Sequence, residues 1–236
     1  MISLACKKAG SGKPLILLHG NGGESTDFEH QTDYFSRDFQ VFAVDTRGHG
    51  KSPRGTKPLS FSQFADDLLA FFDEQKIEKA DIIGFSDGAN TAILFAAKYP
   101  TRVRRLVLCG ACTTAKAVKR SVQIPITIGY AVASRFKNQK AQQNAEILGL
   151  MVNDFGIREE HLRMIQAETL VLAGTKDMIR ESHTKMIAET IPNAKLLFLE
   201  GDHFLPMKRA DAFNKTVEAF LKRRVKKIGW EVFLWI

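Results

Sequence analysis

Short runs of apolar residues alternate along this chain with longer segments in which apolar residues recur every three or four positions. The runs are nearly continuous in Val, Ile, Leu and Phe, as strands buried on both faces of a parallel sheet should be. We predict strands at 14–19, 40–45, 80–85, 102–109, 169–174 and 194–199. The alternation of strands with helices predicts an α/β fold built on a mostly parallel, doubly wound sheet.

The helical spacing is clearest between residues 61 and 75, where six apolar side chains fall on one face of a helix. The same spacing occurs over 89–98 and, more weakly, over 182–191 and 210–221. Each of these segments follows a predicted strand, so we expect them to cover the faces of the sheet.

The regular alternation stops between residues 113 and 166. Helical pieces at 116–122, 129–137, 142–152 and 158–164 fill this interval, with breaks near Pro125 and Gly156. We therefore predict a core formed by 1–112 and 167–236, and a helical lid, 113–166, inserted between two core strands.

The composition is that of an ordinary folded protein, with 44% hydrophobic and 25% charged residues among 236. Three cysteines cannot form a disulfide framework, and the first residues lack the order of a secretion signal, so we expect a cytoplasmic protein. The apolar runs are far shorter than the roughly 18 residues that cross a bilayer, so we expect no membrane span.

The net charge of +8 is uneven along the chain, because five Lys or Arg and one Glu in 222–236 carry half of it. This distribution does not indicate nucleic acid binding. The same segment ends in aromatic residues, and a basic cluster followed by aromatics could contact an anionic surface. We favour a solvated helix end followed by a docked apolar terminus.

The segment Gly84-Phe85-Ser86-Asp87-Gly88 has the pattern G-x-S-x-G between a predicted strand and a predicted helix. A serine on such a sharp turn has a strained backbone, and the residues two positions away must be small. The turn exposes the hydroxyl and directs the helix N-terminus at any negative charge that forms beside it. The pattern alone fits either a catalytic nucleophile or a plain Gly-Ser turn.

Two other segments change that balance. Residues 17–23 read LLHGNGG after a strand, and residues 45–52 read DTRGHGKS, which matches D-x-R-G-x-G-x-S. With the G-x-S-x-G pattern in the same order, nearly the whole chain resembles the α/β-hydrolase family. The resemblance implies an oxyanion hole made by backbone N–H groups, here of Asn21 and Asp87, and a structural role for His49.

A serine nucleophile needs a base, and the base needs an acid that holds its tautomer. The resemblance implies the order serine, acid, histidine. Asp177 and His203 each follow a predicted strand, and so lie at the same sheet edge as Ser86. We predict that Ser86, Asp177 and His203 form a catalytic triad.

Other candidates fit less well. No acidic residue occurs from 88 to 145, which excludes an acid directly after the strand 102–109. We expect Asp202 to point away from His203, and His183 to be a solvated surface residue. His30 and His161 do not follow a strand.

Metal, redox and nucleotide sites are not indicated. Cys109 and Cys112 form a C-x-x-C pattern, but they lack the surrounding motif of a redox protein and no other pair completes a zinc site. The glycines of 20–23 are not followed by the Lys-Ser/Thr of a phosphate loop. We therefore expect no cofactor and no metal.

Asp87 directly follows the predicted nucleophile, and two interpretations stay open. A carboxylate in the first turn of a helix is favoured by the helix dipole by roughly 0.3–1 kcal/mol. Alternatively, it could face the pocket and meet an ammonium group of the substrate. Ten Lys or Arg residues lie between 88 and 145, so the front of the lid should be electropositive and could steer anionic substrates.

These features predict a serine hydrolase of carboxylic esters or related acyl compounds, working on a small-molecule substrate through an acyl-enzyme. Thioester, lactone, C–C bond or peptide hydrolysis and perhydrolysis stay open on the same fold. A ligand-binding module with slow or no turnover is the alternative from another class. The oligomeric state is not predicted.

Overall fold

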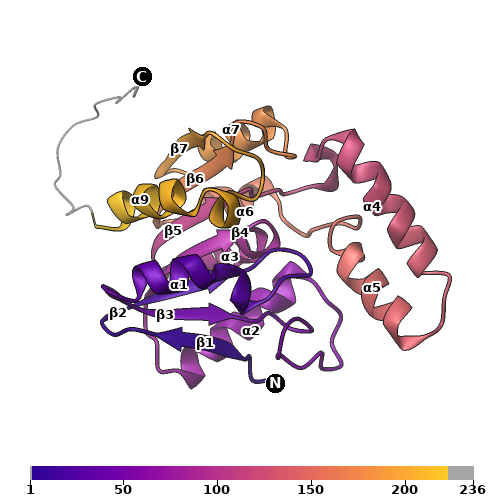
Figure 1. Cartoon of the computed structure of the whole chain (residues 1–236), viewed down its shortest axis with the longest axis horizontal. Coiled ribbons are helices and arrows are strands. Elements are labelled where there is room, and N and C mark those ends of the chain that lie inside the picture. The colour runs from indigo at the N-terminus through magenta and orange to yellow at the C-terminus, as the bar shows by residue number, and fades with distance from the viewer. Residues whose placement is uncertain (1, 223–236) are drawn as a thin grey trace.

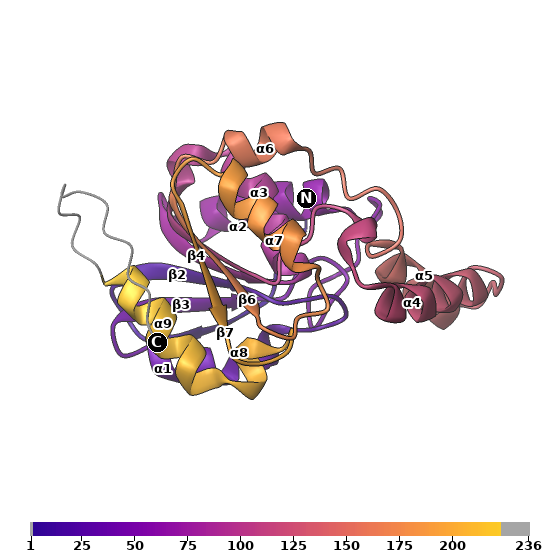
Figure 2. The same cartoon turned by 90° about the horizontal axis from the view of Figure 1, so that it is seen from above.

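The computed structural model describes residues 2–222, which form a seven-stranded sheet between two layers of helices (Figures 1 and 2). The strands lie in the order β1-β3-β2-β4-β5-β6-β7, and all neighbours are parallel except β1 and β3. Their bounds are β1 Cys6–Ala9, β2 Lys13–Leu18, β3 Phe39–Val44, β4 Ala80–Phe85, β5 Val103–Cys109, β6 Glu168–Gly174 and β7 Ala194–Leu199. The predicted α/β class and the mostly parallel sheet are confirmed.

The six predicted strands are β2 to β7, but β1 was not predicted. This strand has four residues, of sequence CKKA, and pairs antiparallel with β3 at the edge of the sheet. Its two lysines are exposed, as expected at an edge, where charge discourages pairing with other chains. A strand without an apolar run leaves no pattern to detect.

Each face of the sheet is covered by its own set of helices. One layer contains α2 Phe61–Glu74, α3 Asp87–Lys98 and α7 Glu181–Thr190, and the other contains α1 Glu29–Phe35, α8 Leu205–Lys208 and α9 Ala210–Leu221. The predicted helices over 61–75, 89–98, 182–191 and 210–221 are therefore confirmed. Short 3-10 helices lie at Ser25–Phe28, Pro100–Arg102 and Ala115–Ala117.

Helix α2 shows why these segments fold as the pattern predicts. Ser60 caps it, because its side chain accepts a hydrogen bond from the backbone N–H of Gln63. Its buried face packs on α3, where the rings of Phe72 and Phe95 lie 4.9 Å apart. Each such buried Phe contributes roughly 1.5–3 kcal/mol.

The segment between β5 and β6 has two parts. Helices α4 Arg120–Ala133 and α5 Gln139–Gly149 pack against each other and project from the carboxyl edge of the sheet (Figure 1). Helix α6 Glu159–Arg163 instead packs against α3 and α7. The residues that follow α5 are partly buried, and Leu150, Phe155 and Leu162 belong to the same hydrophobic core as α2, α3 and α7.

The predicted helix break near Pro125 is wrong, because α4 runs through that residue. Proline removes one hydrogen bond, here the one to the carbonyl of Ser121. Pro125 and Ser121 are both exposed, so water can satisfy that carbonyl and the helix continues. The predicted break near Gly156 is confirmed, since Gly156 has a φ of +68° in the loop before α6.

Within residues 2–222, no helix combines the length and the apolar character needed to cross a bilayer. The basic and aromatic segment 223–236, for which we predicted a solvated helix end and a docked terminus, lies outside the described residues.

Candidate active site

Ser86 lies on a tight turn between β4 and α3. Its φ of 53° is in the left-handed region, which is unusual for a residue with a side chain. A Cβ on Gly84 would lie 2.5 Å from the carbonyl oxygen of Gly88, and a Cβ on Gly88 would lie 2.0 Å from that of Leu18. The predicted need for small residues on both sides of Ser86 therefore has a direct steric cause.

Ser86, His203 and Asp177 form one hydrogen-bonded row at the carboxyl edge of the sheet. The Oγ of Ser86 lies 3.1 Å from Nε2 of His203, and Nδ1 of His203 lies 2.8 Å from Oδ1 of Asp177. They follow β4, β7 and β6, so three parallel strands deliver them to one edge. A carboxylate can only accept, so Nδ1 carries the proton and Nε2 faces the hydroxyl as an acceptor.

The environment of Asp177 keeps its side chain ionised. Burial alone would raise the pKa of this carboxyl, but the hydrogen bond and charge of His203, together with backbone N–H bonds from Ile179 and Gly174, outweigh burial and lower the pKa. Both Asp177 and His203 are buried, with 4% and 3% of their surface exposed. The row is therefore set to orient the imidazole and stabilise its charged form.

Two residues that support His203 were not singled out from the sequence. Gly110, directly after β5, has a φ of +64°, and a Cβ there would lie 2.6 Å from Cε1 of His203. The centroid of the Phe85 ring lies 5.0 Å from that of the imidazole ring. A glycine immediately after a buried strand was the available signal for Gly110.

The competing residues lie elsewhere. Asp202 is turned toward the solvent, where it bonds the backbone N–H of Phe204 and Nζ of Lys208. His161 accepts a bond from the backbone N–H of Arg158 at the start of α6, and His30 is exposed. The prediction for His183 is wrong: the side chain is half-buried, and Nε2 accepts a hydrogen bond from the backbone N–H of Thr113. It therefore links α7 to the loop after β5.

Side chains and backbone groups of residues 45–52 form hydrogen bonds within their own loop and to the neighbouring loop that begins at His19. Asp45 accepts backbone N–H bonds from Ser25 and Lys51, and Arg47 makes a buried bidentate pair with Asp67, with both distances 2.6 Å. The backbone N–H of Thr46 donates to Nε2 of His19 at 3.0 Å.

His49 is buried in the same segment, and Nδ1 lies 3.0 Å from the carbonyl oxygen of Arg47. Burial lowers the pKa of His49, and burial together with the neighbouring His49 lowers that of His19 to about 4. Both imidazoles are therefore neutral at neutral pH, and His49 lies among residues that hold the loop together.

The side chains of Asn21 and Asp87 form a hydrogen bond with each other. The Nδ2 of Asn21 lies 2.8 Å from Oδ2 of Asp87 and also 2.8 Å from the carbonyl oxygen of Ile147 in α5. Asp87 has only 8% of its surface exposed. Its carboxylate is therefore engaged by Asn21, and the interpretation in which it meets a substrate ammonium stays a prediction.

The buried carboxyl of Asp87 should cost stability when it is charged. Burial raises its pKa from 3.8 to about 6, against the opposing effects of the Asn21 bond and of His203. Asp87→Asn is therefore expected to raise the free energy of unfolding at pH 8 by up to about 3 kcal/mol, at about 1.4 kcal/mol per pKa unit. Because the pKa of Asp87 is raised in the folded protein, its charged carboxylate destabilises the fold fully above about pH 6. This destabilisation disappears as the pH falls toward 4 and the carboxyl becomes protonated in both states.

Urea unfolding of both proteins at pH 8 and pH 4.5 checks this expectation, with the exposed Asp33→Asn as a control that should change little. The advantage of Asp87→Asn should shrink strongly at pH 4.5. A variant no more stable than the parent at pH 8 would contradict it.

A groove borders the Asn21 loop. Its volume is 660 Å³, and it lies between that loop and the projecting helices. The lining side chains are mainly small or aliphatic, from Gly22, Gly129, Val132, Ala133, Ala141, Asn144, Ile147 and Leu148. This size suits a small organic ligand.

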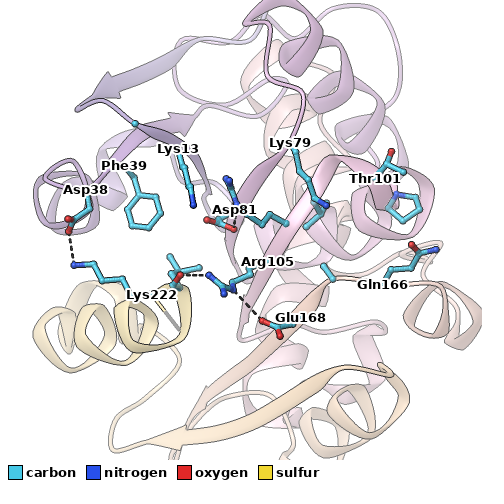
Figure 3. A pocket seen from close by; sticks show the side chains of 16 residues that line it. Lys13, Asp38, Phe39, Lys79, Asp81, Thr101, Arg105, Gln166, Glu168 and Lys222 are labelled. Atoms are coloured by element: carbon cyan, nitrogen blue, oxygen red, sulfur yellow. Dashed lines mark hydrogen bonds and ion pairs between the residues drawn. The ribbon is translucent and has the colours of Figure 1, made fainter. Parts of the chain in front are cut away.

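A larger cavity, of 1180 Å³, lies at the opposite, amino edge of the sheet (Figure 3). Ion pairs join Arg104 to Asp81 and Arg105 to Glu168 on its walls. Its lining includes none of the predicted site residues. The volume of a cavity therefore does not single out the edge of the sheet that carries Ser86, His203 and Asp177.

Cys109 and Cys112 are buried free thiols. Burial raises the pKa of Cys109 well above its ordinary value and that of Cys112 to about 12. The thiolate that metal binding or disulfide exchange requires is disfavoured at both positions. Within residues 2–222, no group of three or more His, Cys, Asp or Glu side chains has the arrangement of a metal site.

Comparison with known proteins gives a family match and several similar proteins. Residues 13–149 match the family described as "alpha/beta hydrolase fold". The chain is 28% identical to 2-hydroxymuconate semialdehyde hydrolase of Pseudomonas putida, over 90% of this chain and 88% of that protein. It is 28% identical to serine hydrolase BPHL of Mus musculus, over 94% of this chain and 84% of that protein. The solved enol-lactonase from Burkholderia xenovorans LB400 is similar in fold, with a TM-score of 0.76, 24% identity and coverage of 94% and 97%.

Proposed function

This chain belongs to the alpha/beta hydrolase fold family, and from that premise we propose that it is a serine hydrolase of carboxylic esters or related acyl compounds. Hydrolysis is the chemistry that the family and its relatives support. The observation that carries the finer proposal is the row of contacts from Ser86 through His203 to Asp177, with distances of 3.1 and 2.8 Å.

The proposed reaction has two halves. Ser86 Oγ attacks the substrate carbonyl carbon while Nε2 of His203 takes the hydroxyl proton, and Asp177 stabilises the imidazolium. The tetrahedral intermediate then expels the leaving group, which receives that proton, and leaves an acyl-enzyme on Ser86. A water molecule, deprotonated by His203, attacks the acyl carbon, and the proton returns to Oγ as the carboxylic acid leaves.

The oxyanion of each tetrahedral intermediate would be bound by the backbone N–H groups of Asp87 and Asn21. The N–H of Asp87 is in the first turn of α3, where no intrahelical acceptor exists. The loop of Asn21 lies against the nucleophile, since a Cβ on Gly20 would be 3.3 Å from Cβ of Ser86. Donors placed in this way stabilise developing charge without reorganising.

The insertion, 113–166, is proposed to form a lid beside the site. The groove between the Asn21 loop and its projecting helices has a largely apolar lining, and Ser86, Asp177 and His203 are not among its lining residues. One alternative has a specific observation in its favour: the similarity to 2-hydroxymuconate semialdehyde hydrolase supports hydrolysis of a C–C bond. The same serine, base and oxyanion donors would serve an ester, a thioester or a lactone.

Labelling followed by a substrate panel tests the proposal. A fluorophosphonate should label the native protein once, and at least one carboxylic ester, thioester or lactone should be turned over with multiple cycles per protein. Adding a vinylogous diketone to the panel tests the C–C alternative. A folded protein that is neither labelled nor active on any of these compounds would support the non-catalytic ligand-binding module.

A further inference from the structure

The side chain of Asn21 joins three parts of the protein that are far apart in the sequence. Its Nδ2 carries two hydrogens, and its two acceptors are the Asp87 carboxylate and the Ile147 carbonyl oxygen, both at 2.8 Å. Asp87 is 66 residues away and Ile147 is 126 residues away. One amide thus connects the loop after β2, the start of α3 and the end of α5.

The surroundings of Asp87 leave its carboxylate dependent on this bond. Among residues 2–222, Asn21 is the one side chain that donates a hydrogen bond to it. The space behind it, lined among others by His19, Thr46 and His49, is too small for a water molecule. A buried carboxylate without a donor is costly, so the bond to Asn21 should be persistently formed.

The carbonyl oxygen of Ile147, at the end of α5, is free to accept the second hydrogen bond from Asn21. Ile147 is within the last four residues of a helix that ends at Gly149, where carbonyl oxygens lack their usual intrahelical partners. The backbone N–H of Leu150 supplies one bond to this oxygen at 3.2 Å, and Asn21 supplies the shorter one. The contact therefore anchors the base of the projecting helices to the Asn21 loop.

We propose that the side-chain bond between Asn21 and Asp87 is a clamp that fixes the spacing of the two oxyanion-binding N–H groups, and that Ile147 ties this clamp to α5. The inference rests on the proposed function, because Asn21 and Asp87 are the two residues whose backbone N–H groups are assigned to the oxyanion. Asp87 and Asn21 act here as positioning residues through their side chains. Their backbone groups do the binding.

The clamp has a clear kinetic consequence. Deleting an oxyanion donor outright typically lowers kcat by about 100- to 1,000-fold. Loosening the spacing of two donors that are still present should cost less, about 10- to 100-fold, and should act on the transition state more than on substrate binding. We therefore expect kcat to fall while KM stays within about threefold.

A double-mutant cycle on the native chain tests the clamp. Asp87→Ala and Asn21→Ala should each lower kcat on a p-nitrophenyl ester by about 10- to 100-fold. The kcat of the double variant should be no lower than that of the less active single variant, because both changes remove the same hydrogen bond. Asp87→Asn keeps an oxygen that can accept from Asn21, so it should lose clearly less activity than Asp87→Ala. Asn193→Ala, an exposed asparagine far from the site, is the matched control and should behave as the parent.

A charge-swapped pair separates the two contacts of Asn21. In Asn21→Asp with Asp87→Asn, the new amide can donate to the new carboxylate, so the clamp is restored. The contact to Ile147 is lost, because two oxygens would then face each other. We expect activity to return only in part, and a full return would show that Ile147 does not tie the clamp to α5. The affinity for a trifluoromethyl ketone, which forms a tetrahedral adduct with the serine, should follow kcat/KM across the series.

Different outcomes overturn different claims. If the parent is labelled and active but Asp87→Ala and Asn21→Ala stay within twofold of it, or if their effects multiply, the clamp is wrong and the proposed function stands. If the parent is neither labelled nor active, the proposed function fails and the clamp fails with it. Asn21→Ala probes the same bond from the other side should Asp87→Ala fail to fold.

Discussion

Ser86→Ala is expected to lower kcat on a simple ester by about ten-thousandfold to a millionfold, and to abolish labelling by a fluorophosphonate. The hydroxyl oxygen is the atom that forms the covalent bond in the proposed mechanism, and its distance of 3.1 Å from His203 places it to lose its proton. The residual rate would come from substrate binding and the oxyanion donors alone.

The measurement is the turnover number of purified variants together with mass spectrometry of the labelled peptide. Ser182→Ala is the control, because Ser182 is exposed in α7. It should be labelled and active like the parent. The label should map to Ser86 alone. Labelling of another serine in folded Ser86→Ala would show that the nucleophile is misassigned.

Asp177→Asn is expected to lower kcat by about ten-thousandfold while the protein stays folded. The carboxylate accepts from Nδ1 of His203 at 2.8 Å. An amide could present its NH₂ group instead, which would favour the tautomer with the proton on Nε2, facing Ser86. The imidazole could then not take the hydroxyl proton.

Asp202→Asn is the matched control for this change, because Asp202 is next to His203 in the sequence but bonds Lys208 and Phe204. It should alter kcat by less than about threefold. Kinetics of both variants with circular dichroism as a check on folding are sufficient. A larger loss in Asp202→Asn than in Asp177→Asn would mean that the acid is misidentified.

The pattern of apolar residues was sufficient for most of the fold, and its failures share a cause. Strands β2 to β7 and the larger core helices bury continuous or periodic apolar surfaces, so burial leaves a trace in the sequence. Strand β1 depends on backbone pairing with β3, and α4 continues through Pro125 because water can replace the lost hydrogen bond. Backbone pairing and solvation leave no hydrophobic pattern to detect.

The sequence by itself determined where chemistry could occur. Gly84 and Gly88 restrict the turn of Ser86 by steric contacts that no side chain could tolerate, and such local constraints are visible in a five-residue motif. The positions of Asp177 and His203 after strands predicted the edge of the sheet to which they belong. Both inferences depend on local chain geometry.

Only the tertiary structure decided which of these groups meet. Ser86 and His203 are 117 residues apart, and their 3.1 Å contact depends on the register of parallel strands that bring separate loops together. The direction of the Asp87 carboxylate was decided in the same way, by Asn21 and the end of α5. A hydrogen bond is sensitive to tenths of an ångström, and that precision comes from the packing of the whole core.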